Sequence, residues 1–412
     1  MEYDAIVVGS GPAGFLAAGR AAERGLSVLL LEKMKKPGRK LLLTGKGRCN
    51  ITNNLPVNEF IKHVFPSGRF LRYAFSHFYS KEILNLLERY GVPVNLERGG
   101  RYFPKSNKSV DVLRTFIKWN EDLNVKILTG KRVEKLLAKN KVIYGVEADG
   151  QRFLARSVIL ATGGKSYPAT GSNGQGYELA KQLGHTVENV RPSLVPLETE
   201  GVLAKKLQGL TLKNVRAVVW VNNKKAGEEF GELLFTHFGL SGPIILTLSR
   251  IVVDELQKNN EVEITIDLKP ALDEQKLDTR LLRDLNEHGK KKISNMFRSW
   301  LPSSMVPVFI DLMEMDPDKA CHQISSKERK QIRYQLKNLR FQITGHRPFN
   351  EAIITAGGIS TKEISPKTME SKFISGLHFA GEMIDLDAKT GGFNLQIAYS
   401  TGWLAGDSAQ GT

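Results

Sequence analysis

A glycine-rich turn near the N-terminus places the strongest constraint on what this chain can fold into. Residues 9–14 read Gly-Ser-Gly-Pro-Ala-Gly, and they lie between a short apolar run, Tyr3–Val8, and an alanine-rich segment, Ala13–Arg24. A second apolar run, Ser27–Leu31, ends at Glu32. This order predicts a strand, a tight turn, a helix and a second strand, a unit that requires a parallel sheet. The chain is therefore expected to be an α/β protein.

The glycines and the acidic residue of this unit have the spacing of a dinucleotide-binding site. Gly9 permits the tight turn, Gly11 lets the backbone approach a pyrophosphate, and Gly14 lets the helix pack closely on the strand. The free N–H groups at the start of the helix attract the phosphates. Glu32 is placed to accept hydrogen bonds from the adenosine ribose. On its own, the pattern fits either FAD or NAD.

Four later segments favour FAD. They are Leu41–Asn53, Ile159–Gly164, Phe379–Asp385 and Thr390–Tyr399, and each contains at least one glycine where a cofactor has to approach the backbone. The last is expected to start a helix whose N–H groups would stabilise negative charge on a reduced flavin. A second nucleotide fingerprint is not evident in the sequence, so NAD(P)H is expected to act as a transient reductant without a domain of its own.

These segments, together with others, resemble the YhiN/BaiN-like family of bacterial FAD-dependent flavoproteins. The matching stretches are GSGPAG, LLLTGKGRCNITN, LFTHFGLSGP, TAGGIS, PKTMESK, FAGEMID and TGGFNLQIAYSTGWLAG, between Ile6 and Gly406. The resemblance implies a glutathione-reductase-like FAD-binding Rossmann domain interrupted by an inserted β-barrel-plus-helix domain. It also implies one of several activities: reduction of an activated C=C bond in steroid-like substrates, oxidation of small amino ketones, or reduction of a ribosomal RNA uridine to dihydrouridine.

The domain boundaries follow from where glycine-containing turns occur along the sequence. The glycine-turn pattern stops near Pro192 and returns after Arg347, so the FAD-binding domain is expected in two parts, residues 1–192 and 348–412, around an insert of residues 193–347. Within the first part, Glu59–Tyr90 reads as a helical stretch. The segments expected in the insert are strands at Val215–Val221 and Val262–Leu268, and helices at Asp278–Leu301, Pro302–Met315 and Lys327–Leu336.

The pattern and the resemblance together assign four groups of candidate cofactor-binding residues. The first turn and the following strand contribute Gly9, Gly11, Pro12, Ala13, Gly14, Glu32 and Lys33. The flavin-proximal loop contributes Lys40, Thr44, Gly45, Arg48 and Asn50. The middle of the chain contributes Val133, Ala161, Thr162 and Gly163. The C-terminal turns contribute Gly381, Glu382, Gly392, Phe393, Asn394 and Leu395.

Two residues are candidates for the catalytic proton donor. His237 lies in a glycine- and proline-containing turn, and histidine is the side chain most often used for proton transfer near neutral pH. Cys49 lies between Arg48 and Asn50, where neighbouring cations would lower the pKa of its thiol. Both residues also fit structural roles, at a domain interface or as a small buried side chain. Tyr167 and Arg347 are weaker candidates for polar contacts to a substrate.

The charge distribution indicates a polyanionic partner. The chain of 412 residues carries 59 basic and 43 acidic side chains, a formal net charge of +16, and residues 1–192 alone carry 31 basic and 16 acidic side chains. Basic and aromatic residues interleave in that half, a composition that suits single-stranded RNA and equally suits helices with an aromatic core and a cationic surface. The residues concerned are Lys62, Arg69, Phe70, Arg72, Tyr73, Phe75, Arg98, Arg101, Tyr102, Phe103, Lys105, Lys108, Arg114, Lys118 and Trp119.

The sequence therefore predicts an FAD-dependent oxidoreductase that reduces an activated C=C bond, with a ribosomal RNA uridine as the leading substrate. A small-molecule flavin reductase or oxidase, and a non-catalytic flavin-stabilised RNA-binding or redox-sensing protein, stay open as alternatives. Cys49 and Cys321 have neither the number of a disulfide framework nor the spacing of a zinc site, so no metal is predicted. Ordinary composition, with 41% hydrophobic and 25% charged residues, indicates a soluble protein, and the expected compartment is the cytoplasm.

Overall fold

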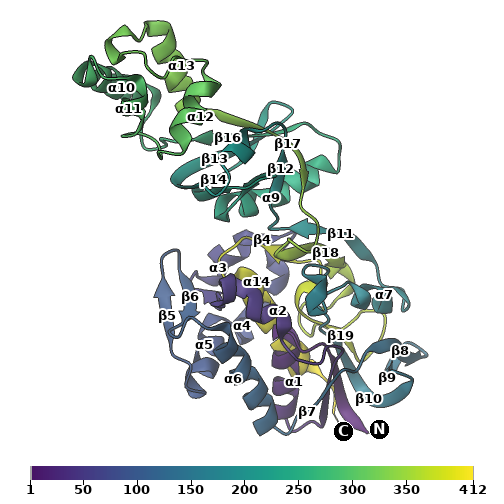
Figure 1. The fold of residues 1–412 in the computed structure, drawn as a ribbon. Helices are drawn as coiled ribbons and strands as arrows, with labels where there is room; N and C mark the ends of the chain where they lie inside the picture. The colour runs from purple at the N-terminus through teal and green to yellow at the C-terminus, as the bar shows by residue number, and fades with distance from the viewer. Residues whose placement is uncertain (1, 412) are drawn as a thin grey trace. The chain divides into compact units, whose positions relative to one another are not determined.

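A seven-stranded sheet organises the first of two compact units in the computed structural model, which describes residues 2–411. This first unit comprises Met1–Ser193 and Phe349–Thr412, and the second comprises Leu194–Pro348. In Figure 1 the two ends of the chain lie together at the foot of the first unit. The chain leaves this unit through β11 (Val187–Ser193) and returns into β18 (Ile354–Ile359), and these two strands pair antiparallel, with Ser193 opposite Ile354.

Five strands of the sheet run parallel in the order β7-β2-β1-β10-β19. They are β1 (Tyr3–Val8), β2 (Val28–Glu32), β7 (Lys126–Thr129), β10 (Gln151–Leu160) and β19 (Leu377–Phe379). The first half of β10 instead pairs antiparallel with β9 (Val142–Ala148), which pairs with β8 (Val133–Lys139). Residues 5–7 of β1 are fully buried, as expected of a central parallel strand covered on both faces.

Shorter elements complete the first unit. Its α-helices are α1 (Pro12–Glu23), α2 (Arg39–Leu43), α3 (Val57–Phe60), α4 (Arg72–His77), α5 (Ser80–Arg89), α6 (Ser109–Asp122), α7 (Gln175–Lys181) and α14 (Phe393–Ser408). Its 3-10 turns are η1 (Thr44–Gly47), η2 (Ile61–His63), η3 (Gly68–Leu71), η4 (Pro168–Thr170), η6 (Thr361–Glu363) and η7 (Gly381–Met383). Two small sheets are formed by β3 (Thr52–Asn53), β5 (Val94–Glu97) and β6 (Arg101–Pro104), and by β4 (Val64–Phe65) and β20 (Asp387–Ala388).

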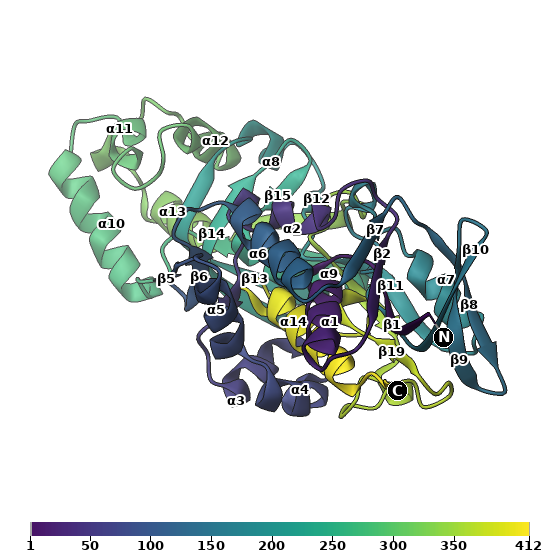
Figure 2. The ribbon, with the colours of Figure 1, turned by 90° about the horizontal axis from the view of Figure 1, so that it is seen from below.

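Helices α1 and α14 pack against each other through small residues, and they lie side by side in Figures 1 and 2. A Cβ atom on Gly402 would lie 2.2 Å from the carbonyl oxygen of Ala13, and one on Gly406 would lie 2.2 Å from that of Ala17. Because both contacts advance by four residues, the two helices run in the same direction. The N-terminus of α14 therefore lies about eight residues, or roughly 12 Å, beyond that of α1.

The second unit contains a closed antiparallel barrel, in the order β12-β15-β14-β13-β16-β17. Its strands are β12 (Leu197–Thr199), β13 (Thr211–Val221), β14 (Lys224–Phe235), β15 (Gly239–Ser241), β16 (Val262–Asp267) and β17 (Leu339–His346). Its helices are α8 (Leu203–Lys206), α9 (Pro243–Leu256), α10 (Glu274–His288), α11 (Ile293–Phe297), α12 (Met305–Leu312) and α13 (Ser326–Lys337), with the 3-10 turn η5 (Cys321–Gln323). A hydrophobic core of its own, separate from that of the first unit, fills this unit.

The predicted fold class is confirmed: the chain combines a Rossmann-type parallel sheet with a barrel and helices. Two helical expectations are wrong in detail. The expected helix Asp278–Leu301 is broken into α10 and α11, since Gly289 adopts φ +33° and ends the first helix. The expected helical stretch Glu59–Tyr90 consists of short helices and turns interrupted by β4. Among residues 2–411, no helix is both long and apolar enough to cross a membrane.

Candidate cofactor-binding site

The first glycine turn lies at the carboxyl end of β1. Gly9 adopts φ +103°, and a Cβ atom there would lie 2.5 Å from the carbonyl oxygen of Ala161 at the end of β10. A Cβ atom on Gly14 would lie 1.8 Å from the oxygen of Gly9, so only glycine allows α1 to start this close to the strand. Around Gly11, by contrast, no atom lies within 4 Å of the added carbon. The backbone therefore leaves space for a ligand in front of the α1 N-terminus.

Glu32 is held in place at the end of β2. One carboxylate oxygen accepts hydrogen bonds from the backbone N–H of Ser10 at 3.0 Å and from its hydroxyl at 2.6 Å. The other accepts from the N–H of Met34 at 2.8 Å. The first turn thus orients the carboxylate predicted to bind a ribose. The neighbouring ammonium of Lys33 donates to Asn173 at 2.7 Å, and burial lowers the pKa of this lysine while Glu32 opposes the shift.

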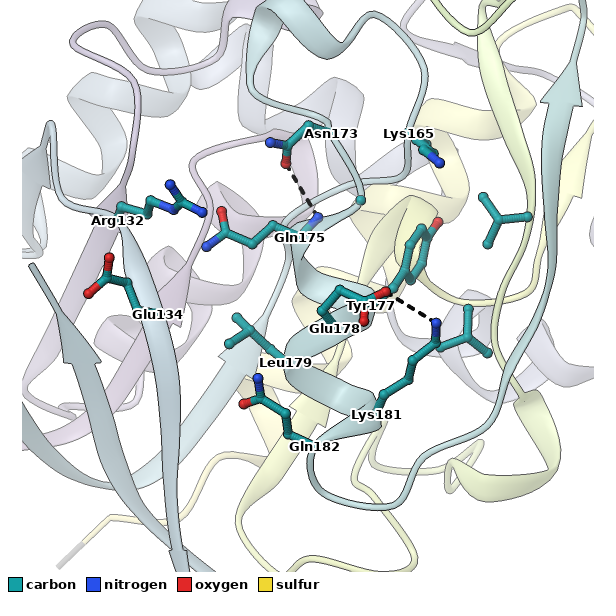
Figure 3. A pocket seen from close by; sticks show the side chains of 13 residues that line it. Arg132, Glu134, Lys165, Asn173, Gln175, Tyr177, Glu178, Leu179, Lys181 and Gln182 are labelled. Atoms are coloured by element: carbon teal, nitrogen blue, oxygen red, sulfur yellow. Dashed lines mark hydrogen bonds and ion pairs between the residues drawn. The ribbon is translucent and has the colours of Figure 1, made fainter.

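A cavity of about 530 Å³ lies next to these residues, around α7 (Figure 3). Arg132 and Glu134 lie on one side of the helix and Lys165 on the other. Gln175 lines the cavity and donates to the carbonyl of Val133 at 2.9 Å. Positive and negative side chains both line the cavity, so its charge does not single out an anionic ligand.

Glu382 is the centre of a polar cluster at the next glycine turn. Its carboxylate accepts hydrogen bonds from Lys40 at 2.6 Å, from the hydroxyl of Ser166 at 2.9 Å and from the backbone N–H of Thr355 at 2.9 Å. A Cβ atom on Gly381 would lie 2.8 Å from the Cβ of Ala13, so this turn abuts the start of α1. The C-terminal turn and the first turn, far apart in sequence, are therefore joined at one place.

The loop of residues 44–50 has an unusual backbone. Gly45, Lys46, Gly47 and Cys49 all adopt positive φ angles, between 57° and 84°. Arg48, predicted to meet phosphate or flavin, already has partners: it forms an ion pair with the carboxylate of Glu97, and its guanidinium lies over a phenylalanine ring at 4.1 Å. Thr44 donates its hydroxyl to the carbonyl of Leu41 in the preceding helix α2 at 2.7 Å.

Helix α14 begins directly opposite this loop. A Cβ atom on Gly392, which adopts φ +92°, would lie 2.9 Å from the side-chain oxygen of Asn50. Asn394 exchanges two hydrogen bonds with the backbone of Ala388, at 2.9 and 2.8 Å, so its side chain fixes the helix start rather than pointing out to a ligand. Phe393 stacks on His63 at 4.8 Å, and Leu395 is partly buried in the core of the first unit.

These features fit FAD. Six buried side-chain polar atoms have no hydrogen-bond partner among the described residues, and two of them, the side-chain oxygen of Asn50 and the hydroxyl of Ser172, lie at these turns, as expected where a ligand completes the bonding. Ser172 lies beside Gly163 and Asn50 lies beside Gly392. The offset N-termini of α1 and α14 present two partly positive helix ends, one suited to a pyrophosphate and one suited to the flavin ring beyond a ribityl chain.

The two catalytic candidates lie in different environments. Cys49 is completely buried, and burial raises the pKa of its thiol to about 12, with only partial opposition from the side chains of Thr44 and Tyr399. The expectation that neighbouring cations lower this pKa is therefore wrong. His237 belongs to the second unit, where it is exposed at the turn between β14 and β15.

The turn that carries His237 is well braced. Thr236 closes it with two hydrogen bonds to Gly239, at 2.8 and 2.9 Å. The guanidinium of Arg347 lies 4.6 Å from the ring centre of Phe238 and pairs with Glu198 at 2.8 Å. Arg347 therefore supports this turn.

Tyr167 adopts φ +51° in the first unit, where its backbone N–H bonds to Phe349. Burial raises the pKa of the Tyr167 hydroxyl, and Glu351 adds to the shift. Cys321 is buried in the core of the second unit.

A buried Ser–His–Glu arrangement elsewhere in the first unit has a structural role. The two ring nitrogens of His185 lie 2.9 Å from the hydroxyl of Ser371 and 3.3 Å from the carboxylate of Glu363. The hydroxyl oxygen of Ser371 also accepts the N–H groups of Phe373 and Ile374. Since this oxygen is buried and already bonded, it is not an available nucleophile.

Sequence reasoning missed several residues of the site. Ser10, Ser166 and Thr355 orient the carboxylates of Glu32 and Glu382. Ser10 lies inside the glycine fingerprint and could have been singled out there. Ser166 and Thr355 lie 189 residues apart and meet only through the fold, so spacing along the chain contains no signal for their pairing.

The model of the HI0933-like protein Rossmann domain matches residues 3–408. A 3-dehydro-bile acid delta(4,6)-reductase of Clostridium scindens is 31% identical over 407 residues, which cover 98% of each chain. A ribosomal RNA dihydrouridine synthase of Escherichia coli is 32% identical over 405 residues, covering 98% of this chain and 96% of its own. The open form of a flavocytochrome c3 fumarate reductase shares the fold, with a TM-score of 0.51 and 17% identity, covering 99% of this chain and 78% of that chain.

Proposed function

The chain belongs to the HI0933-like family of FAD-dependent oxidoreductases, and within that family we propose that it reduces the C5=C6 bond of a uridine in ribosomal RNA. The observation that carries the choice of substrate is positive charge without internal counter-ions. Arg98, Arg101, Lys105 and Lys108 form no ion pair with any residue in the range 2–411, and three of them are exposed. FAD has only about two phosphate charges, so it does not account for an excess of this size.

The position of these cations supports the proposal. They lie on the β5–β6 hairpin and the loop after it, and β6 pairs with β3, the strand that follows the loop of residues 44–50. The side chain of Asn53 in β3 donates both to the carbonyl of Gly99 in the hairpin and to that of Gly391 before α14. The basic hairpin is thus attached to the two segments proposed to hold the flavin ring, where RNA phosphates would have to pass.

The cofactor residues proposed above would hold FAD along the first unit. Glu32 would bind the adenosine ribose, the N-terminus of α1 would bind the pyrophosphate, and Glu382 with Lys40 would bind the ribityl chain. Once reduced, bound FAD would supply a hydride to C6 of the uracil, which is conjugated to a carbonyl. The target base must be unstacked to reach such a site, which favours a single-stranded or loosened RNA region.

The second hydrogen enters at C5 as a proton. We propose His237 as its donor because the imidazole is exposed on a braced turn and its class of side chain transfers protons near neutral pH. Cys49 is the alternative donor, and its burial makes it the weaker of the two. NAD(P)H is proposed as the reductant of FAD. The insert of residues 193–347 is proposed to serve substrate binding and residues 1–192 and 348–412 to serve FAD binding.

The deciding experiment compares ribosomal RNA nucleosides from a wild-type strain and a deletion strain by mass spectrometry. A dihydrouridine that disappears with the gene, and returns with a plasmid copy, supports the proposal. In vitro, anaerobic NADPH or NADH oxidation should depend on unmodified RNA and stop in His237→Asn. Equal dihydrouridine in both strains would exclude RNA as the substrate.

A small-molecule enone is the second candidate substrate, since the Clostridium scindens relative is named as a bile acid reductase. The same reaction at C=C applies to it, with hydride at the β carbon and a proton at the α carbon. Reduction of an enone with no response to RNA, and no effect of hairpin charge on the rate, would favour this candidate.

A further inference from the structure

A ladder of neighbouring aromatic rings, tilted against one another, lies on the first unit beside α14. The guanidinium of Arg20 in α1 lies 4.6 Å from the ring centre of Trp403 in α14. The ring of Trp403 lies 6.3 Å from that of His77 in α4, tilted by 32°, and His77 lies 4.4 Å from Tyr73, tilted by 38°. Figures 1 and 2 both show α4 next to α14.

The inner end of the ladder is fixed. Arg20 donates to one carboxylate oxygen of Asp407 through two nitrogens, at 2.9 and 2.7 Å. Trp403 also stacks on the buried ring of Phe78, at 5.8 Å and 24°. A ring nitrogen of His77 lies 2.9 Å from the carbonyl oxygen of Tyr73, which sets the orientation of the imidazole. The ladder is thus preorganised before any ligand arrives.

The outer end of the ladder is open. Tyr73 is 39% exposed and His77 is exposed, so the rest of the first unit leaves both rings accessible to a ligand. Arg72, next to Tyr73 in sequence, and Arg69, four residues before it in η3, are exposed and form no ion pair within the described part of the chain. Stacking faces flanked by free cations are the two elements with which proteins hold single-stranded nucleic acid.

We propose that Tyr73 and His77 form a stacking platform for an unpaired base of RNA, with Arg69 and Arg72 binding the phosphates on either side. The platform is separate from the β5–β6 hairpin and gives the RNA a second point of attachment on the first unit. The proposal rests on the RNA substrate proposed above, and it adds which bases must be unpaired: one at the flavin and one at this platform.

The experiment measures binding of a fluorescent, uridine-rich single-stranded oligoribonucleotide to the FAD-loaded full chain at several salt concentrations. Tyr73→Ala should weaken binding roughly ten-fold, since a base loses its stacking partner, and leave the salt dependence unchanged. Tyr73→Phe keeps the ring and should bind like the wild type. Replacing Arg69 and Arg72 by glutamine should lower the slope of log affinity against log salt by about 0.7 for each phosphate that the variant no longer binds.

The matched control is Tyr334→Ala, which removes another exposed tyrosine, 47% exposed on α13 next to Arg333, whose guanidinium pairs with Asp278. It should not change binding. A 4-thiouridine oligonucleotide should crosslink under light to the tryptic peptide of residues 73–81. Wild type that does not bind the oligonucleotide at low salt, or Tyr73→Ala that binds as tightly as wild type, would overturn the proposal. If the oligonucleotide binds as expected but dihydrouridine levels are equal with and without the gene, the proposed reaction fails and the proposed base-stacking platform is retained.

Discussion

Glu32 is the side chain whose loss should affect cofactor content most directly. In Glu32→Ala, the partner for the ribose hydroxyls disappears, and so does the acceptor for Ser10 and Met34. We expect FAD to bind about 1–3 kcal/mol more weakly, which is roughly five- to 150-fold in Kd. Fluorescence titration of the apoprotein with FAD measures this. Glu23→Ala, at the outer end of α1, is the control and should retain FAD like the wild type.

A second experiment tests the identity of the cofactor. Heat-denatured wild-type protein should release FAD, identified by chromatography against FMN and NAD standards. Recovery of FMN alone, or no flavin after incubation with FAD, would contradict the assignment of the first turn to an adenine dinucleotide.

Cys49 makes stability depend on alkaline pH. Burial raises the pKa of its thiol from 9.0 to about 12, so the unfolded chain releases this proton at lower pH than the folded one. The stabilisation is complete below about pH 9 and is lost as the pH rises toward 12. Between pH 8 and 10, the free energy of unfolding should fall about 1.4 kcal/mol more in the wild type than in Cys49→Ser. Urea titrations at the two pH values measure it, and parallel losses in both proteins would rule out the buried thiol as the cause.

The contact between α1 and α14 is the next feature to test. In Gly402→Ala, the added methyl group would meet the backbone of Ala13 at 2.2 Å, so the two helices must move apart. We expect a loss of about 1–3 kcal/mol in stability and a weaker hold on FAD, because both proposed helix-end contacts shift. Thermal unfolding and FAD titration measure the two effects. Ser408→Ala, in the last turn of α14, should change stability by less than about 0.5 kcal/mol.

The basic residues of the β5–β6 hairpin and the loop after it should contribute to RNA binding and not to FAD binding. Reversing Arg98, Lys105 and Lys108 to glutamate should weaken RNA binding and reduce its salt dependence, with FAD content unchanged. Arg101 is kept, since it lies over the ring of Phe103 and helps to hold the hairpin. The control reverses Lys135, Lys139 and Lys141 on the β8–β9 hairpin, which changes net charge equally. If both triple variants lose RNA affinity equally, RNA binding depends only on the total charge of the protein and not on the hairpin.

Elements with a strong apolar pattern were predictable from the sequence. The strand Tyr3–Val8 was predicted with the bounds that the structure has, and Val262–Leu268 differs from β16 by one residue. β14 was missed because its first nine residues include five charged side chains and no buried one, so neither strand face shows an apolar repeat. The β5–β6 hairpin was missed for a similar reason, since β5 has no fully buried residue.

The candidate site was predictable to the extent that it consists of glycine turns. A single glycine in the sequence can indicate a place where the backbone has no room for a side chain. This is the case at Gly9, Gly14 and Gly392, where an added Cβ atom would lie too close to neighbouring atoms. Polar networks are different, because they join residues from distant segments. Lys40 and Glu382 were each named from the sequence, but their ion pair follows only from the sheet and helices that bring them together.

Viewed as a whole, the chain is expected to tolerate removal of its second unit. Because Ser193 pairs with Ile354, a short glycine–serine linker could replace residues 194–348 without stretching β11 or β18. The shortened protein should fold and bind FAD, while RNA-dependent NAD(P)H oxidation should be lost with His237. Circular dichroism, FAD titration and the oxidation assay measure these outcomes. A shortened protein that folds and binds no FAD would show that the second unit takes part in holding the cofactor.

The paired exit strands also have a mechanical consequence. Both connections to the second unit leave from the same end of the β11–β18 ladder, at Ser193 and Ile354. A force that pulls on the second unit would load the hydrogen bonds of this ladder one after another rather than all at once. Sequential rupture needs less force than shear of a whole ladder, so the junction would open one hydrogen bond at a time, while the seven-stranded sheet stays unloaded.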